Sequence, residues 1–313
     1  QYAAWRMPLP PSNGIDYRLV GTHLYSAELP QRSDFECNYR AERLARTLPA
    51  FIKEFRSDWT ATAAELLAGV RALELYETRG KGLAELGRYL ADARAYSRHA
   101  WEVHFEFTYP LVMLYAELRD LCTTLGLHET TAKQILQGYR SRVTESDARL
   151  WEFVATVRSE GAADMLLAAA PEAARQAMAR HVAVLVEADR FLAEHGWRTV
   201  TVGDPLDRPW IEDETPFWGT VQTSLRSGDG GYSVGAALAR AAAERDAAIA
   251  QARARLTAAE RSVFERALTD CSDANFIWWS EDHNSLIDMR AFVPVRRAAM
   301  AIGRALDLAA PED

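Results

Sequence analysis

Past residue 36 the apolar side chains recur at spacings of three and four, and runs that alternate apolar with polar residues are nearly absent. The segment 37–79 shows this pattern clearly, because Leu44, Phe51 and Phe55 fall on one face of a helix. No stretch repeats with a period of about 20 to 50 residues, which disfavours a solenoid. The pattern therefore predicts a mainly α, bundle-like domain of several helices over residues 37–313.

Glycine and proline divide the chain into elements. They crowd residues 1–36, which are predicted to form an irregular N-terminal arm or linker, with a short strand or hairpin at "YRLVGTHLYS". Six glycines and three prolines between residues 197 and 235 predict a long loop, and a loop of that length is typically functional or wrapped over the surface. The remaining segments carry the residues that start and stop helices. The predicted helices are 37–79, 83–125 with a kink at Pro110, 129–139, 144–161, 171–196, 236–256, 258–272 and 274–308.

Charge and cysteine content exclude several classes of protein. With 36 basic and 44 acidic side chains, the net charge of −8 offers nothing to a nucleic acid backbone, so no nucleic acid partner is expected. Cys37, Cys122 and Cys271 are odd in number and widely spaced, which predicts reduced packing residues. No apolar run approaches the roughly 20 residues that cross a bilayer, so we expect a cytoplasmic protein without a membrane partner. The opening "QYAAWRMPLPPSNG" is typical of a linker, and we expect a piece of a longer polypeptide.

The segment "FIWWSEDHNSLIDMR", residues 276–290, places two adjacent tryptophans among titratable groups. On a single helix its polar side chains would form two neighbouring stripes. One interpretation is a solvated face whose acids pair with Arg290 and Arg296. The other is a pocket, since pockets are typically aromatic with a few convergent polar groups. The members are Trp278, Trp279, Glu281, Asp282, His283, Asn284, Asp288 and Arg290.

A second concentration of aromatic and titratable residues is "RHAWEVHFEFTYP", residues 98–110. Trp101, Phe105 and Tyr109 step by four and so share a helical face. His104 lies between them, shortly before the predicted kink at Pro110, where a bent helix opens space. His104 is therefore either a core histidine or a catalytic one.

Metal and phosphate-loop chemistry are not expected for this chain. A di-iron bundle needs Glu-x-x-His pairs and zinc hydrolases need His-Glu-x-x-His, and the sequence contains neither pattern. The glycine-rich "SGDGGYSVGAALARA" at 227–241 lacks the lysine and Ser/Thr of a P-loop, so it is more simply a connector.

Several stretches, in order along the chain, resemble the substrate-binding helical region of the phosphoenolpyruvate-synthase-like phosphotransferases, or dikinases. This family includes the rifampicin phosphotransferases and the kinases of phenolic compounds. "HAWEVHFEFTYPL" resembles its aromatic helix, "TESDARLWEFV" its Thr-Glu-x-Asp-x-x-Leu-Trp segment, and "FLAEHGWR" its Phe-Leu-x-x-Tyr-Gly-His-Arg turn. The segment from Trp278 onward resembles its terminal helix. Two positions depart from the family pattern: Trp197 stands where the turn usually has histidine, whose role is then lost or moved to His195, and Ser280 replaces an arginine before Glu281.

The resemblance implies a division of labour. An ATP-grasp domain, which binds ATP and Mg²⁺, charges a histidine on a swivelling domain, and that phosphohistidine then visits the acceptor domain. This chain would be the acceptor domain alone, binding no cofactor itself and inactive without the other domains, on the same polypeptide or another subunit. Its substrate would be a small phenolic compound, as in aromatic catabolism.

The residues named above supply roles for this transfer. His104 and His283 are candidate bases for the hydroxyl proton. Arg198 and Arg290 are candidate clamps for phosphoryl oxygens, since guanidinium binds them bidentately. Glu281 and Asp288 would orient these groups. The predicted aromatic slot for the acceptor consists of Trp101, Phe105, Tyr109, Trp278 and Trp279.

Two alternatives stay open at this point. One is an acceptor domain for a larger antibiotic such as a rifamycin, and the other is a helical ligand-binding module without chemistry. The phenol hypothesis depends on the two aromatic helices meeting across a shared hollow.

Overall fold

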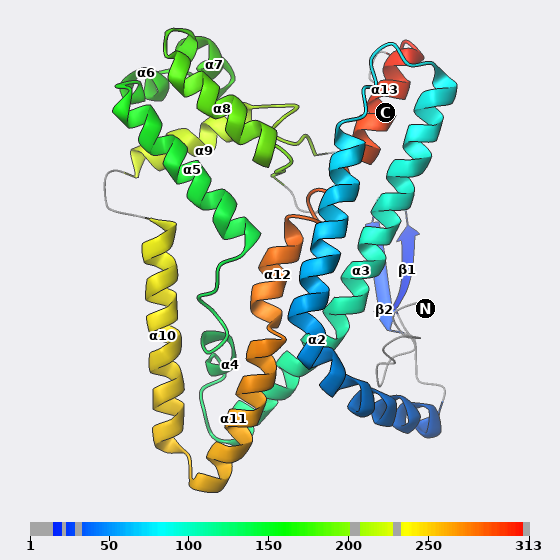
Figure 1. Cartoon of the computed structure of the whole chain (residues 1–313), viewed down its shortest axis with the longest axis vertical. Helices are drawn as coiled ribbons and strands as arrows, with labels where there is room; N and C mark the ends of the chain where they lie inside the picture. The colour runs from blue at the N-terminus through cyan, green and yellow to red at the C-terminus, as the bar shows by residue number, and fades with distance from the viewer. Residues whose placement is uncertain (1–14, 21–22, 29–32, 201–206, 228–232, 309–313) are drawn as a thin grey trace. The chain divides into compact units, whose positions relative to one another are not determined.

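The computed structural model describes residues 15–20, 23–28, 33–200, 207–227 and 233–308 (Figure 1). The fold is mainly α, as predicted. The predicted hairpin is also present: β1 (Ile15–Val20) and β2 (His23–Glu28) pair antiparallel, with Ile15 opposite Glu28 and Val20 opposite His23. The rest of the predicted arm lies outside the described residues, except residues 33–36. Of these, residues 34–36 already belong to the first long helix. Within the described ranges no helix is both long and apolar enough to cross a membrane.

Two long helices follow the hairpin, α2 (Asp34–Glu74) and α3 (Leu83–Thr124). α3 ends close to the predicted position, because Gly126 adopts a φ of 68°, a conformation that glycine tolerates best. α2 ends at Glu74, five residues before the predicted end at 79, so Gly80 lies in the following loop. The helical assignment of α3 continues through Pro110.

The contacts along the chain divide it into two compact units. Unit 1 holds the described residues within 1–62, 101–136 and 247–277, and unit 2 those within 63–100, 137–246 and 278–313. Each unit is described below by itself.

Unit 1 has an aromatic core where α2 and α3 lie side by side. The Phe107 ring lies 6.0 Å from that of Phe55 and 5.4 Å from that of Trp59, both in edge-on orientation. Cys122 and Cys271 are buried packing residues, as predicted, and burial raises the pKa of the Cys122 thiol to about 11 and that of Cys271 to about 12. The side chain of Cys37 lies outside the described residues.

The remaining helices of unit 1 are short or amphipathic. These are α4 (Thr131–Gln134), the C-terminal part of α10 (Val234–Arg255) and α11 (Ala258–Asp273). The two alanine-rich helices were predicted at nearly these bounds. α11 begins with a capping box in which Thr257 and Glu260 each bond the other's backbone N–H.

Unit 2 contains a cluster of short helices built around α5 (Arg142–Ser159), α8 (Val182–His195) and α9 (Thr215–Arg226). Its core includes Phe153, Phe191, Phe217 and Trp218, all at most 5% exposed. The buried Gln222 amide donates to the carbonyls of Leu166 and Ala169 at 2.8 and 2.9 Å, which connects α9 to the C-terminal end of α6 (Ala163–Ala168). Short elements connect α5 to α8: α6 (Ala163–Ala168), η1 (Pro171–Ala173), α7 (Ala174–Ala177) and η2 (Met178–Arg180).

Three predicted elements of unit 2 were wrong. The helix predicted over 171–196 is broken, because His181 leaves helical geometry with φ −100° and ψ 72°. The loop predicted over 197–235 contains α9, which starts with Pro216 in its first turn, where no backbone N–H is needed. The helix predicted over 274–308 is two helices, α12 (Phe276–Asn284) and α13 (Val293–Ala305). Residues 285–292 between them are turns, and Pro294 lies in the first turn of α13, where no backbone N–H donor is needed.

Candidate functional site

The segment after α12 belongs to unit 2, and it does not form the helical stripes that the sequence suggested. α12 ends at Asn284, and residues 285–292 are turns, so Asp288 and Arg290 do not continue its faces. Ile287 N–H donates to the His283 carbonyl, but Met289 N–H reaches back to Asn284, which shows the change of geometry. The polar side chains are therefore placed by turns and ion pairs.

His283 is held between a tryptophan and a carboxylate. Its ring stacks on Trp279 with centroids 4.0 Å apart and planes at 5°, and the two residues are 4% and 1% exposed. Nδ1 lies 2.9 Å from the Trp279 carbonyl oxygen, and Nε2 lies 3.5 Å from Asp288 Oδ2. Because a carbonyl can only accept, Nδ1 donates to it, and Nε2 is the ring nitrogen that faces Asp288. His283 is thus oriented to take up a proton beside a carboxylate that would stabilise the resulting imidazolium.

Arg290 is buried, at 7% exposed, and paired with Glu74 near the end of α2. Nε donates to Glu74 Oε1 at 2.8 Å and Nη2 to Oε2 at 2.5 Å, a bidentate pair. Arg297 of α13 donates to the main-chain carbonyl of the same Glu74. Glu74 therefore fastens the end of α2 to the segment that carries Arg290, and sequence spacing could not reveal a partner 216 residues away.

Arg198 lies in the turn after α8 and contacts the start of α5. Its Nη1 donates to Asp147 at 2.8 Å and to Ser146 Oγ at 3.0 Å, and the guanidinium lies over the Trp210 ring at 5.0 Å. The pair is partly buried, with side-chain exposures of 19% for Arg198 and 40% for Asp147. Arg198 and Arg290 are thus each paired with a carboxylate. These carboxylates belong to Asp147 and Glu74, and not to the acids of residues 281–288.

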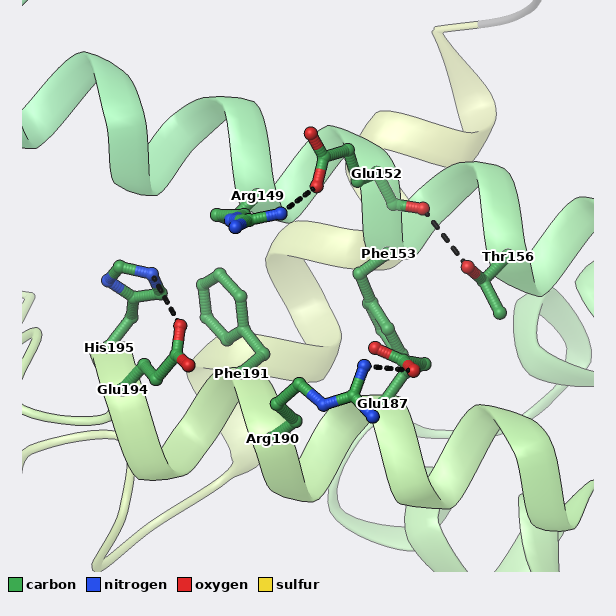
Figure 2. A pocket seen from close by; sticks show the side chains of 9 residues that line it. All are labelled: Arg149, Glu152, Phe153, Thr156, Glu187, Arg190, Phe191, Glu194 and His195. Carbon is green, nitrogen blue, oxygen red and sulfur yellow. Dashed lines mark hydrogen bonds and ion pairs between the residues drawn. The ribbon is translucent and has the colours of Figure 1, made fainter.

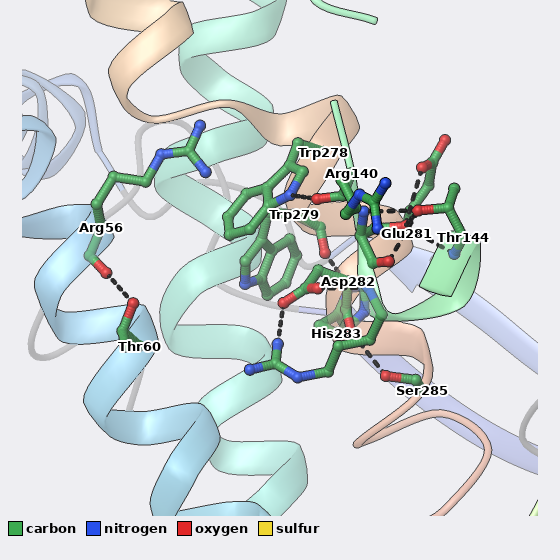
Figure 3. Close-up of polar contacts among 12 residues, drawn as sticks. Arg56, Thr60, Arg140, Thr144, Trp278, Trp279, Glu281, Asp282, His283 and Ser285 are labelled. Carbon is green, nitrogen blue, oxygen red and sulfur yellow. Dashed lines mark hydrogen bonds and ion pairs between the residues drawn. The ribbon is translucent and has the colours of Figure 1, made fainter. Parts of the chain in front are cut away.

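Two candidates on α12 have partners on the segment before α5, as Figure 3 shows. The Trp278 indole donates to the Arg140 carbonyl at 2.8 Å, and Glu281, which is exposed, accepts from Ser141 Oγ at 3.4 Å. Asp282, to which the sequence analysis assigned no role, is 3% exposed and accepts the backbone N–H of Arg142 at 2.8 Å as well as its guanidinium. The sequence did not indicate that Asp282 is buried, because the segment was interpreted as one amphipathic helix in which Asp282 lies between Glu281 and His283.

Unit 1 holds the other predicted set, on α3. Trp101, Phe105 and Tyr109 form a ladder, with centroids 6.0 and 5.8 Å apart. The His104 ring lies 4.9 Å from Trp101 and meets Phe105 edge-on at 5.1 Å. All four side chains are half-buried. The predicted site residues thus fall into two internally contacting sets, one in each unit, and a meeting of the two sets stays a prediction.

Known proteins resemble this chain over different lengths. It is 26% identical to chondramide synthase cmdD of Chondromyces crocatus over 307 residues, which is 93% of this chain and 8% of that protein. It is also 26% identical to the uncharacterized phosphotransferase YvkC of Bacillus subtilis over 146 residues, 43% of this chain and 17% of that protein. The chain therefore spans only a small part of each of these relatives. No solved structure matches it at a significant level.

The family comparison covers more than half of the chain. Residues 105–281 match the rifampicin phosphotransferase fourth domain, a range that runs from the aromatic ladder of α3 to the middle of α12. The sequence resemblance to phosphotransferases of the phosphoenolpyruvate-synthase type is confirmed by this match. The chain belongs to the rifampicin phosphotransferase fourth-domain family.

Proposed function

We propose that this chain is the acceptor-binding domain of an ATP-dependent phosphotransferase that transfers a phosphoryl group from a phosphohistidine to a small phenolic hydroxyl. Family membership supports the phosphotransferase part of this proposal. The observation that carries the catalytic part is the arrangement of His283, whose Nδ1 faces a carbonyl while Nε2 faces Asp288.

The proposed step is a single displacement. The phenolic oxygen attacks the phosphorus, the P–N bond to the partner's phosphohistidine breaks, and the electron pair returns to that imidazole. The phenolic proton passes to Nε2 of His283, and Asp288 stabilises the charge. A phenol has a pKa of about 10, by analogy with tyrosine, so one positioned imidazole suffices as the base. His104 is the second candidate base, beside its own aromatic ladder.

The two arginines would stabilise the phosphoryl oxygens. Glu74 occupies Nε and Nη2 of Arg290, which leaves the Nη1 side of the guanidinium to receive an oxygen. Arg198 is held by Asp147 and lies over Trp210, so it would act with little loss of side-chain freedom. Glu281, which is exposed, would act only by orienting neighbours.

Rings on both sets would grip a flat acceptor. The ladder of Trp101, Phe105 and Tyr109 is half-buried and so offers ring surface to a ligand. Trp278 is also half-buried, whereas Trp279 is covered on one face by His283. ATP and Mg²⁺ would be bound by a partner domain, and this chain alone would be inactive.

A rifamycin-type antibiotic is the second candidate acceptor, and the family description favours it. A third possibility is a binding module without chemistry. The experiment mixes the chain with ATP-grasp and phosphohistidine domains from a phosphotransferase of this family, ATP, Mg²⁺ and either a panel of phenols or rifampicin. Mass spectrometry then detects phosphorylated product.

His283→Gln and His104→Gln are compared with His128→Gln, whose ring is exposed and bonds only its local turn. We expect aryl phosphate with the parent chain and the control, and at least a tenfold loss of kcat with one of the two variants, with acceptor binding retained. If rifampicin is phosphorylated and no phenol is, the acceptor is a rifamycin-type antibiotic and the phenol proposal is wrong. Acceptor binding without any phosphorylated product would support the module.

A further inference from the structure

Helices α5 and α8 of unit 2 enclose a hollow of about 360 Å³ that plays no part in the proposed reaction (Figure 2). This size lies at the lower end of the range for small-molecule sites, about 300–1,000 Å³. Each helix contributes one face, because its residues recur at spacings of three and four. The lining residues are Arg149, Glu152, Phe153, Thr156, Glu187, Arg190, Phe191, Glu194 and His195.

The floor of the hollow is aromatic and rigid. Phe153 and Phe191 are 4% and 5% exposed and belong to the core of unit 2. Phe191 stacks on Phe217 at 5.3 Å, and Phe153 contacts the same ring at 5.3 Å. Their ring edges would meet an apolar group of a ligand without moving.

The rim of the hollow carries arginines and glutamates that form weak ion pairs, which a ligand could replace. Arg149 bonds Glu152 at 2.7 Å and Arg190 bonds Glu187 at 2.6 Å, each within its own helix. The arginine side chains are 61% and 62% exposed, and such surface pairs contribute only about 0–1 kcal/mol. A ligand carboxylate could therefore take a guanidinium from its glutamate, which would stay solvated.

One end of the hollow places opposite charges close together. Figure 2 shows Arg149 of α5 and Glu194 and His195 of α8 around the Phe191 ring. The pKa of Arg149 is raised mainly by its bond to Glu152 and also by the charge of Glu194 across the gap. Burial lowers the pKa of His195, with Glu194 opposing and Arg198 and Arg149 adding to the effect, so this ring is neutral near pH 7.

The charges of the lining indicate the kind of ligand. Two arginines and three glutamates sum to 2 − 3 = −1 with His195 neutral. A simple anion would be repelled by three carboxylates, and a simple cation would meet two guanidinium groups. A zwitterion carries both charges, so it could pair with Arg149 and with Glu194, which lie at the same end of the hollow.

We propose that this hollow binds a small zwitterion with an apolar or aromatic side chain, of the α-amino acid type. Its carboxylate would bond Arg149, its ammonium group would bond Glu194, and its side chain would lie on Phe191 and Phe153. This site is independent of the proposed phosphoryl transfer, because it needs neither the phosphohistidine nor His283.

The test measures binding of L-phenylalanine to the chain by isothermal titration calorimetry. N-acetyl-phenylalanine lacks the ammonium charge and phenethylamine lacks the carboxylate, and each should bind about tenfold more weakly, as expected for one lost charge-assisted bond of about 1.4 kcal/mol. Arg149→Gln and Glu194→Gln should weaken phenylalanine binding to a similar extent. Arg226→Gln and Glu172→Gln, at exposed positions away from the hollow, serve as matched controls and should leave binding unchanged.

Far-UV circular dichroism confirms that each variant is folded. The proposal is overturned if phenylalanine shows no saturable binding at millimolar concentration, or if the two hollow variants bind it as the controls do. Tighter binding of phenethylamine or of N-acetyl-phenylalanine would also overturn it, in favour of a cation or an anion site.

Discussion

Replacing Glu74 by glutamine removes the counter-charge of Arg290 while keeping the size of the side chain. Loss of one partner of a buried ion pair costs about 3–5 kcal/mol, because the other charge stays buried without compensation. The Arg290 side chain is 9% exposed and that of Glu74 26%, so some water already reaches the pair. We therefore expect a loss at the lower end, about 3 kcal/mol, which is a change of about 100-fold in the unfolding equilibrium.

Urea unfolding followed by far-UV circular dichroism and tryptophan fluorescence measures this loss. The bond from Arg297 to the Glu74 main-chain carbonyl survives the substitution, so the experiment isolates the side chain. Glu77→Gln, an exposed position in the loop after α2, is the control and should stay within about 0.5 kcal/mol of the parent. The double variant Glu74→Leu with Arg290→Met should regain most of the stability, since an apolar pair replaces the charges.

A change below about 1 kcal/mol for Glu74→Gln would refute the reasoning, because Arg290 would then not depend on Glu74 for its charge. No recovery in the double variant would refute it as well, since the cost would not then come from an unpaired charge.

Three further predictions concern unit 2. Gly138→Ala should lower the Tm of the protein more than Gly80→Ala does. Both glycines have positive φ, but only at Gly138 would the new Cβ lie 2.7 Å from a backbone nitrogen, that of Ala242. Equal losses of Tm would contradict this prediction. Gln222→Leu should cost about 1–3 kcal/mol in urea unfolding, because a buried carbonyl at Leu166 and a partly buried one at Ala169 lose a donor. An unchanged midpoint would show that these carbonyls find other partners. Burial lowers the pKa of His195 in the folded protein below its ordinary value of 6.5. The unfolded chain therefore binds the proton more readily than the folded one. The contribution of His195 to stability is present above pH 6.5 and is lost as the pH falls below it. The fall in Tm between about pH 7.5 and 5.5 should be larger for the parent than for His195→Gln, and an equal fall would contradict the lowered pKa.

The long helices could be predicted because their information is local. Uninterrupted apolar spacing indicates α2 and α3, and Gly126 with its positive φ follows the end of α3, whereas α2 ends at Glu74, before Gly80. The hairpin was predicted from the arrangement of its turn residues and short apolar runs. α9 was missed because the glycines and prolines around it outweighed Pro216, which is a residue that starts helices.

The candidate site could be predicted only in part, because long-range partners decide it. The segment 276–290 is rich in aromatic and titratable residues, and His283 does stack on Trp279. The partners Glu74 and Asp147 lie far away in sequence. Asp147 belongs to the segment that resembles the family's Thr-Glu-x-Asp pattern, but nothing in that segment indicates that Asp147 pairs with Arg198. The turn after Asn284, which places Asp288 beside His283, has no glycine or proline within it to mark it in the sequence.

The transfer step itself is tested most directly in a single turnover. A phosphohistidine domain carrying ³²P on its histidine is separated from ATP and mixed with a phenol that is phosphorylated in the reconstituted system, with and without this chain. We predict that label moves to the phenol only when the chain is present, and at least tenfold more slowly with His283→Gln or His104→Gln than with His128→Gln. Transfer at the same rate without the chain, or at an unchanged rate in both histidine variants, would contradict the role proposed for this domain.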